Sequence, residues 1–156
     1  MQTTTSPKAE TQSASVDKLQ DLLRSEMFAV ETYELALKSV SHVGLHRALQ
    51  EILVNHSRRI PQLREKIVGL NGEPPTSTGI WGAFAKAFQA GADLLGDRTA
   101  ISALEDGEDK SVALYASDMT DVDARTRKFI ETELAPEQNH THALCRTLKS
   151  YISAPS

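Results

Sequence analysis

The sequence predicts an all-α protein, an antiparallel four-helix bundle with a short extra helix in the long connection between its second and third helices. Only 5% of the 156 residues are aromatic, and no run of alternating β-branched residues indicates a strand. Apolar residues instead recur at steps of three and four in four long segments. The first connection between these segments is so short that it must reverse the chain direction.

Composition narrows the class of protein. A chain of 156 residues has the size of one domain, and its net charge of −4 provides no basic patch for nucleic acid. No apolar run approaches the roughly 18 residues of a membrane span, and the N-terminus lacks a signal-peptide pattern. We therefore expect a cytoplasmic protein without nucleic-acid or membrane partners. Cys145 is the single cysteine, which excludes an intrachain disulfide.

The first helix is predicted to span about 16–40. Residues 1–15 contain almost nothing to bury and are expected to form a disordered tail, which leaves 16–153 as the bundle. The inward stripe of this helix is apolar except for Glu26, whereas Glu31 and Glu34 lie off the stripe and should be solvated.

The second helix is predicted to run from about residue 44 to Leu70 and to stop at Asn71-Gly72. Its inward stripe contains His56 near the middle, and Arg59 follows one turn later on the same side. Residues 80–95 carry an aromatic stripe and are interpreted as a short helix lying across the bundle. The stripe, with Trp81, Phe84 and Phe88, could cover the core or form a partner surface.

The third helix is predicted over 97–119 and the fourth over 123–153. Glu105 and Glu108 interrupt the apolar stripe of the third helix near its middle. In the fourth helix Glu137 and Thr141 occupy inward positions. His140 lies one turn after Glu137, with His142 as the alternative inward imidazole. Buried carboxylates need a cation, a proton donor or a metal.

Each of these polar residues lies near the midpoint of its own helix, so helices packed side by side would bring them to one level. Four carboxylates and two imidazoles in one interior layer are the ligand inventory of a two-metal carboxylate site, with Fe or Mn as the fitting metals. The candidate metal ligands are Glu26, His56, Glu105, Glu108, Glu137 and His140.

Four motifs resemble the ferritin-like superfamily, which includes bacterioferritins and rubrerythrins. They are Ser25-Glu-Met-Phe-Ala-Val-Glu-Thr-Tyr33, the Leu70-Asn-Gly-Glu-Pro74 turn, Gly107-Glu108 followed by Tyr115, and Glu137-x-x-His140. From Leu70 onward the sequence is most similar to a group of bacterial ferritin-like proteins known as a domain of unknown function. The resemblance covers about 16–152 and implies a ferritin-like bundle whose subunits pair, so a homodimer is expected.

The resemblance also implies one Glu from the first helix, one from the third, and a Glu-x-x-His pair from each of the other two. In the second helix that pair is replaced by His56 and Arg59. Two hypotheses follow. In one, Glu105 supplies the missing carboxylate, and an Fe or Mn centre serves iron handling or O₂ and peroxide chemistry, with Tyr33 or Tyr115 as proton or electron donor. In the other, Arg59 and the histidines neutralise the carboxylates, and a metal-free bundle acts as a structural or stress-related protein-interaction module. Whether the protein is an enzyme is left open.

Overall fold

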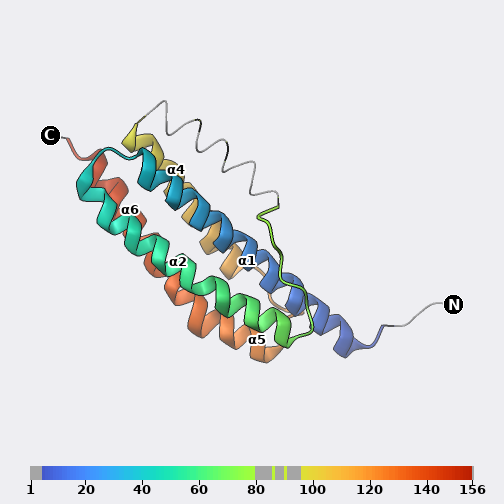
Figure 1. The fold of residues 1–156 in the computed structure, drawn as a ribbon. Coiled ribbons are helices and arrows are strands. Elements are labelled where there is room, and N and C mark those ends of the chain that lie inside the picture. Colours follow the sequence, from blue (N-terminus) through green and yellow to red (C-terminus); the bar gives the residue numbers. More distant parts are fainter. Residues whose placement is uncertain (1–4, 80–85, 87–89, 91–95, 156) are drawn as a thin grey trace.

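The computed structural model of the protein describes residues 5–79, 86, 90 and 96–155. Within these residues the chain is all-α, without β-strands, and its long helices form a four-helix bundle as predicted (Figure 1). The helices are α1 (Pro7–Ser39), α2 (Val43–Gly69) and α4 (Asp97–Ala116), followed by α5 (Ala124–Phe129), the π-helix η1 (Ile130–Leu134) and α6 (Ala135–Ser153). The last three follow one another without a break and together form the predicted fourth helix. The short helix predicted over 80–95 lies outside the described residues.

The first helix begins earlier than predicted. Ser6 has an extended backbone, and Pro7 occupies the first turn of α1, where its missing N–H costs nothing. The side-chain amide of Gln12 donates to the carbonyl of Leu70 at 2.6 Å, and Ser15 is fully buried. The expectation that order begins near residue 15 is therefore corrected, because residues 7–15 form part of α1 and contact the end of α2.

The helices associate as two pairs, with α1 packed mainly on α2 and α4 mainly on α6. Two apolar clusters fill the space between the pairs. One cluster lies at the end of the bundle that holds the α1–α2 turn and includes Tyr33, Leu49, Ile101 and Cys145. The other lies at the opposite end and includes Leu19, Leu63, Tyr115 and Ile130. On every long helix, buried polar residues lie between the residues of these two clusters.

The connections hold the helix ends in register. The backbone N–H groups of Ser41 and His42 both donate to the carboxylate of Asp97 at 2.8 Å, which ties the α1–α2 turn to the start of α4. Asn71, with φ of +59°, ends α2 in the left-handed conformation that the predicted stop requires. Residues 71–79 then return along α1, where the Gln20 amide donates to the Glu73 carbonyl at 2.8 Å (Figure 1).

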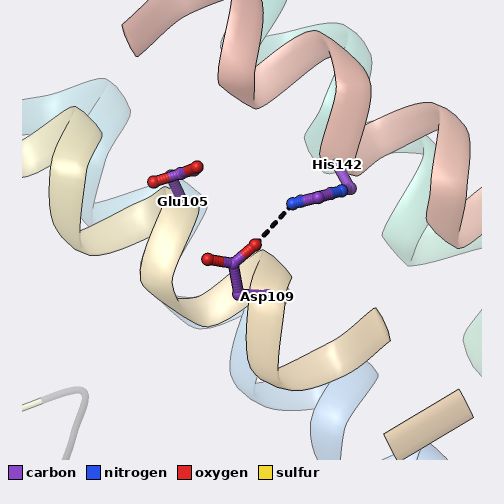
Figure 2. Close-up of side chains that lie close together, drawn as sticks. All are labelled: Glu105, Asp109 and His142. Carbon is purple, nitrogen blue, oxygen red and sulfur yellow. Dashed lines mark hydrogen bonds and ion pairs between the residues drawn. The ribbon is translucent and has the colours of Figure 1, made fainter. Parts of the chain in front are cut away.

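In the described residues, the outer faces of the helices carry mostly polar side chains, with a few exposed apolar residues such as Val43 and Val68. Glu31 and Glu34 are exposed as predicted, and between α4 and α6 the Nε2 atom of His142 lies 2.6 Å from Oδ1 of Asp109 (Figure 2). None of the helices in the described ranges has both the length and the apolar character needed to cross a bilayer.

Candidate functional site

Three of the six candidate ligands meet in the centre of the bundle. Nδ1 of His56 lies 2.7 Å from Oε2 of Glu26, and Nε2 of the same ring lies 2.9 Å from Oε1 of Glu108. All three side chains are almost completely buried. The prediction that α1, α2 and α4 bring these residues to one level is confirmed.

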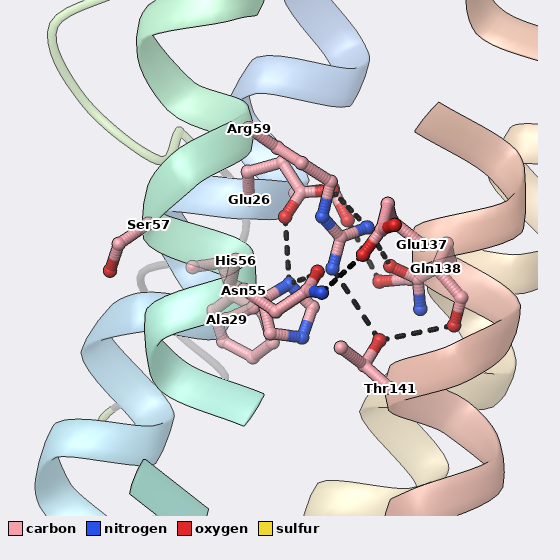
Figure 3. A network of polar contacts seen from close by, with 12 residues as sticks. Glu26, Ala29, Asn55, His56, Ser57, Arg59, Glu137, Gln138 and Thr141 are labelled. Atoms are coloured by element: carbon pink, nitrogen blue, oxygen red, sulfur yellow. Dashed lines mark hydrogen bonds and ion pairs between the residues drawn. The ribbon is translucent and has the colours of Figure 1, made fainter. Parts of the chain in front are cut away.

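Arg59 belongs to the same cluster. It lies one turn after His56 on α2, its side chain is 1% exposed, and its Nη1 atom is 2.9 Å from Oε1 of Glu26 (Figure 3). Nη1 also donates to Oε1 of Gln138 on α6 at 2.6 Å, and the guanidinium carbon lies 5.9 Å from the centre of the Tyr115 ring. A permanently charged cation thus stands against the Glu26 carboxylate.

Both oxygens of Glu26 are occupied by donors. The Tyr115 hydroxyl donates to Oε1 at 2.5 Å, beside the contact of the same oxygen with Arg59. Oε2 accepts from His56. Hydrogen bonds from ionised or neutral donors to a carboxylate are stronger than those between two neutral groups. Glu26 is therefore stabilised in place by three groups from α2 and α4.

Glu108 is bound still more completely. Its Oε1 accepts from the Tyr33 hydroxyl at 2.7 Å as well as from His56. Its Oε2 accepts from the Gln138 amide at 2.7 Å and from the Thr141 hydroxyl at 3.0 Å. Four side chains from α1, α2 and α6 thus converge on one α4 carboxylate, leaving neither oxygen without a donor.

The charges of the cluster balance when His56 is protonated. Burial by itself lowers the pKa of His56, but Glu26 and Glu108 on either side outweigh burial and raise that pKa above its ordinary value. Burial likewise opposes ionisation of Glu108, yet hydrogen bonds from His56, Tyr33 and Thr141 lower the pKa of that carboxyl.

The charges of two carboxylates, one guanidinium and one imidazolium then sum to zero. With a proton on Nδ1 directed at Glu26, the 2.8 Å approach of Arg59 Nη2 to this nitrogen is a contact between two donors.

The two tyrosines remain neutral donors. Burial, followed by the neighbouring Glu108, raises the pKa of Tyr33 well above its ordinary value, and burial with Glu26 does the same for Tyr115. Cys145 on α6 belongs to the same apolar cluster as Tyr33, and burial raises the pKa of its thiol to about 12. The two tyrosine hydroxyls donate to carboxylates, and all three groups carry no charge at neutral pH.

The inward orientation predicted for Glu137 and His140 is corrected. Both side chains are exposed, and Gln138 and Thr141 face the interior in their place. The cause is the π-helix η1, in which the N–H of Ala135 donates to the carbonyl of Ile130, five residues back. A π turn contains an extra residue and rotates the following α6 about its axis. Gln138 therefore replaces Glu137 at the inward position, whereas Thr141 faces inward as predicted.

The other predicted ligands also lie outside the buried cluster. His140 lies 3.7 Å from Glu51 at the surface, and His142 bonds to Asp109 instead of pointing inward. The inward stripe of α4 passes through Leu104 and Glu108. Glu105 therefore lies beside this stripe, and its carboxylate pairs with the ammonium group of Lys149.

Four residues that donate to the buried carboxylates were not predicted to do so from the sequence. Tyr33 and Tyr115 were assigned as donors to a metal centre, whereas here they donate to carboxylates. Gln138 was missed, and Thr141 was predicted to face inward but was given no role. Pro136, which removes a backbone hydrogen bond, signals an irregularity of the helix just before them.

A groove of about 710 Å³ lies on the surface between α2 and α6. The side-chain NH₂ group of Asn55 donates to Glu137 (Figure 3). The side-chain oxygen of Asn55, Oδ1, is buried without a hydrogen-bond partner. The groove carries charges of both signs. Its lining residues are Arg47, Gln50, Glu51, Val54, Asn55, Arg58, Glu137 and His140.

Comparison with known proteins gives one family match. A family model described as a domain of unknown function (DUF2383) matches residues 14–121, which is more than half of the chain and extends from α1 to just beyond α4. The matched range includes Glu26, His56, Arg59 and Glu108 and ends before Gln138 and Thr141. No curated protein and no solved structure matches the chain.

Proposed function

We propose a function for this chain, which belongs to the family described as a domain of unknown function (DUF2383). It is a ferritin-like bundle in which a charge-balanced hydrogen-bond network replaces the dimetal centre, and it acts through its surface as a structural or protein-interaction module. The observation that carries the proposal is the Arg59–Glu26 pair, with 2.9 Å between Nη1 and Oε1 and both side chains 1% exposed. The guanidinium supplies the positive charge that a metal ion would bring.

The identities of the inward residues support this proposal. Ferritin-like dimetal sites use one Glu from each of two helices and a Glu-x-x-His pair from each of the other two. In this chain Glu26 and Glu108 correspond to the single glutamates. The pairs are represented by His56 with Arg59 on α2 and by Gln138 with Thr141 on α6, at the same spacing of three residues.

These replacements are poor metal ligands. A guanidinium is always charged and has no lone pair to offer, while an amide and a hydroxyl bind transition metals weakly. The donors that contact Glu26 and Glu108 also occupy the oxygens through which these carboxylates would coordinate. A metal ion could bind only after several of these contacts had been broken and Arg59 had left the cluster.

Restoring the ligands tests the proposal. The variant His56→Glu/Arg59→His/Gln138→Glu/Thr141→His contains the complete ligand pattern, and we expect it to retain about two Fe(II) or Mn(II) ions per chain after anaerobic loading and desalting. Adding Glu108→Gln to this variant should reduce the retained metal. The parent protein should retain no Fe or Mn that depends on Glu108, and admission of oxygen should oxidise Fe(II) no faster than in buffer.

The opposite results have clear meanings. Glu108-dependent Fe or Mn in the parent would support the iron-handling or O₂ and peroxide chemistry of the alternative hypothesis. A folded restored variant that binds no metal would contradict the ferritin-like geometry. Far-UV circular dichroism of each variant distinguishes lost binding from lost folding.

We propose in addition that the protein is a cytoplasmic homodimer that binds neither nucleic acid nor a membrane. The mild net charge of −4 and the single buried cysteine are consistent with it. We assign protein contacts to the groove between α2 and α6. Its lining includes Arg47 and Arg58 as well as Glu51 and Glu137. Sedimentation of the parent and of Arg58→Glu tests this assignment, since a dimer formed through the groove should dissociate more readily in the variant.

A further inference from the structure

We propose that Glu105, Asp109 and His142 form a surface site for a divalent transition-metal ion, with Zn²⁺ as its representative. Each residue offers one ligand atom, and these three atoms lie within 4.8 Å of one another (Figure 2). The two carboxylates come from consecutive turns of α4, and the imidazole comes from α6. This site is distinct from the buried cluster, since none of its residues contributes to the contacts of Glu26, His56 or Glu108 described above.

The geometry requires little rearrangement. Zn²⁺ bonds of about 2.1 Å in a tetrahedral arrangement place ligand atoms roughly 3.4 Å apart. The Nε2–Oδ1 distance between His142 and Asp109 is 2.6 Å, and the other separations are at most 4.8 Å. Small side-chain rotations would bring all three atoms to coordinating positions, because the Asp109 side chain is 57% exposed and has room to turn.

The donor types select the class of ion. Two carboxylates with one imidazole suit Zn²⁺ and neighbouring first-row metals, whereas Mg²⁺ and Ca²⁺ prefer all-oxygen sites. Three protein ligands leave a fourth tetrahedral position for water, which the exposure of Asp109 permits. Bound in this way, the ion would link α4 to α6 from outside the core.

The local field already attracts a cation. The ammonium group of Lys149 pairs with Glu105, and Asp106 and Asp109 add negative charge on the same helix. Lys149 therefore competes with a metal ion for Glu105. Removal of this lysine should strengthen metal binding, an effect that nonspecific binding to exposed carboxylates would not predict.

Calorimetric titration of the tag-free full-length chain with ZnCl₂ in a non-chelating buffer tests the site. We expect one Zn²⁺ per chain, at least tenfold weaker binding in His142→Gln, and tighter binding in Lys149→Met. His140→Gln is the matched control, because His140 is an exposed histidine of the same helix that contacts Glu51. This control should bind Zn²⁺ as the parent does, and MgCl₂ should give no comparable heat.

Several outcomes would overturn the site. They are absence of Zn²⁺ binding in the parent, equal losses in His142→Gln and His140→Gln, or weaker binding in Lys149→Met. Loss of Zn²⁺ in Glu108→Gln but not in His142→Gln would place the ion in the buried cluster and would contradict the proposed function instead. Because the substitutions at His142, His140 and Lys149 lie outside the core, thermal melting without metal checks that each variant is folded.

Discussion

Substitution of Arg59 by methionine tests whether the buried guanidinium holds the polar layer together. Methionine keeps a long, flexible side chain but removes the charge, which leaves the Glu26 carboxylate without its guanidinium partner and Oε1 of Gln138 without its donor. Removal of one partner from a buried ion pair costs about 3–5 kcal/mol. For a domain of this size, where each kcal/mol corresponds to roughly 2–4 °C, the melting temperature should fall by about 6–20 °C.

Two further variants make this prediction specific. Arg64→Met removes an exposed arginine of the same helix, away from the groove, and should change stability by less than about 0.5 kcal/mol. The double variant Arg59→Met/Glu26→Gln removes both charges, so it should be less destabilised than the sum of its single variants. Chemical unfolding followed by circular dichroism measures all four variants. If Arg59→Met resembled Arg64→Met, or if the double variant showed no coupling, the charge-balanced network would be refuted.

The remaining predictions concern pH and the hydrogen bonds to Glu108. Since the folded-state pKa of His56 lies above its ordinary 6.5, its stabilisation is complete below pH 6.5 and is lost as the pH rises through the folded-state pKa; His56→Gln should flatten this alkaline loss in a series of melting curves. The folded-state pKa of Glu108 lies below its ordinary 4.5, so its stabilisation is present above pH 4.5 and is lost as the pH falls through the folded-state value; Glu108→Gln should reduce this acid sensitivity. Tyr33→Phe removes a hydrogen bond to a charged group and should cost about 1.5–3 kcal/mol. Tyr151→Phe, at a residue that is 61% exposed, is its control, and equal stabilities of the two variants would contradict a structural role for the Tyr33 hydroxyl.

The sequence predicted the parts of the bundle that obey regular helical periodicity. Glu26, His56 and Glu108 each interrupt an apolar stripe of an uninterrupted α-helix, so their inward orientation could be derived from spacing alone. Arg59 was recognised as a cation at an inward position for the same reason. Spacing could not determine whether it paired with Glu26 or turned aside, because that depends on how the helices approach one another.

The fourth helix could not be predicted in the same way. Spacing arguments assume 3.6 residues per turn, and the π-helix at 130–134 breaks this assumption just before the polar layer. Gln138 takes the inward position predicted for Glu137, and Thr141 instead of His140 contacts the polar layer, so an amide and a hydroxyl stand where a metal-binding pair was predicted. The start of α1 was missed for a simpler reason, since the polar composition of residues 1–15 favoured a disordered tail, whereas Pro7 is compatible with the first turn of a helix.

The most direct test of the central claim is the metal content of tag-free protein after anaerobic loading with Fe(II) or Mn(II) and desalting, compared among the parent, Glu108→Gln and His142→Gln. If Arg59 and His56 balance the buried carboxylates, the parent and Glu108→Gln will retain equal amounts of metal, and any retained ion will be lost in His142→Gln. Near-stoichiometric Fe or Mn that disappears in Glu108→Gln but remains in His142→Gln would contradict the account and would place a metal centre in the core.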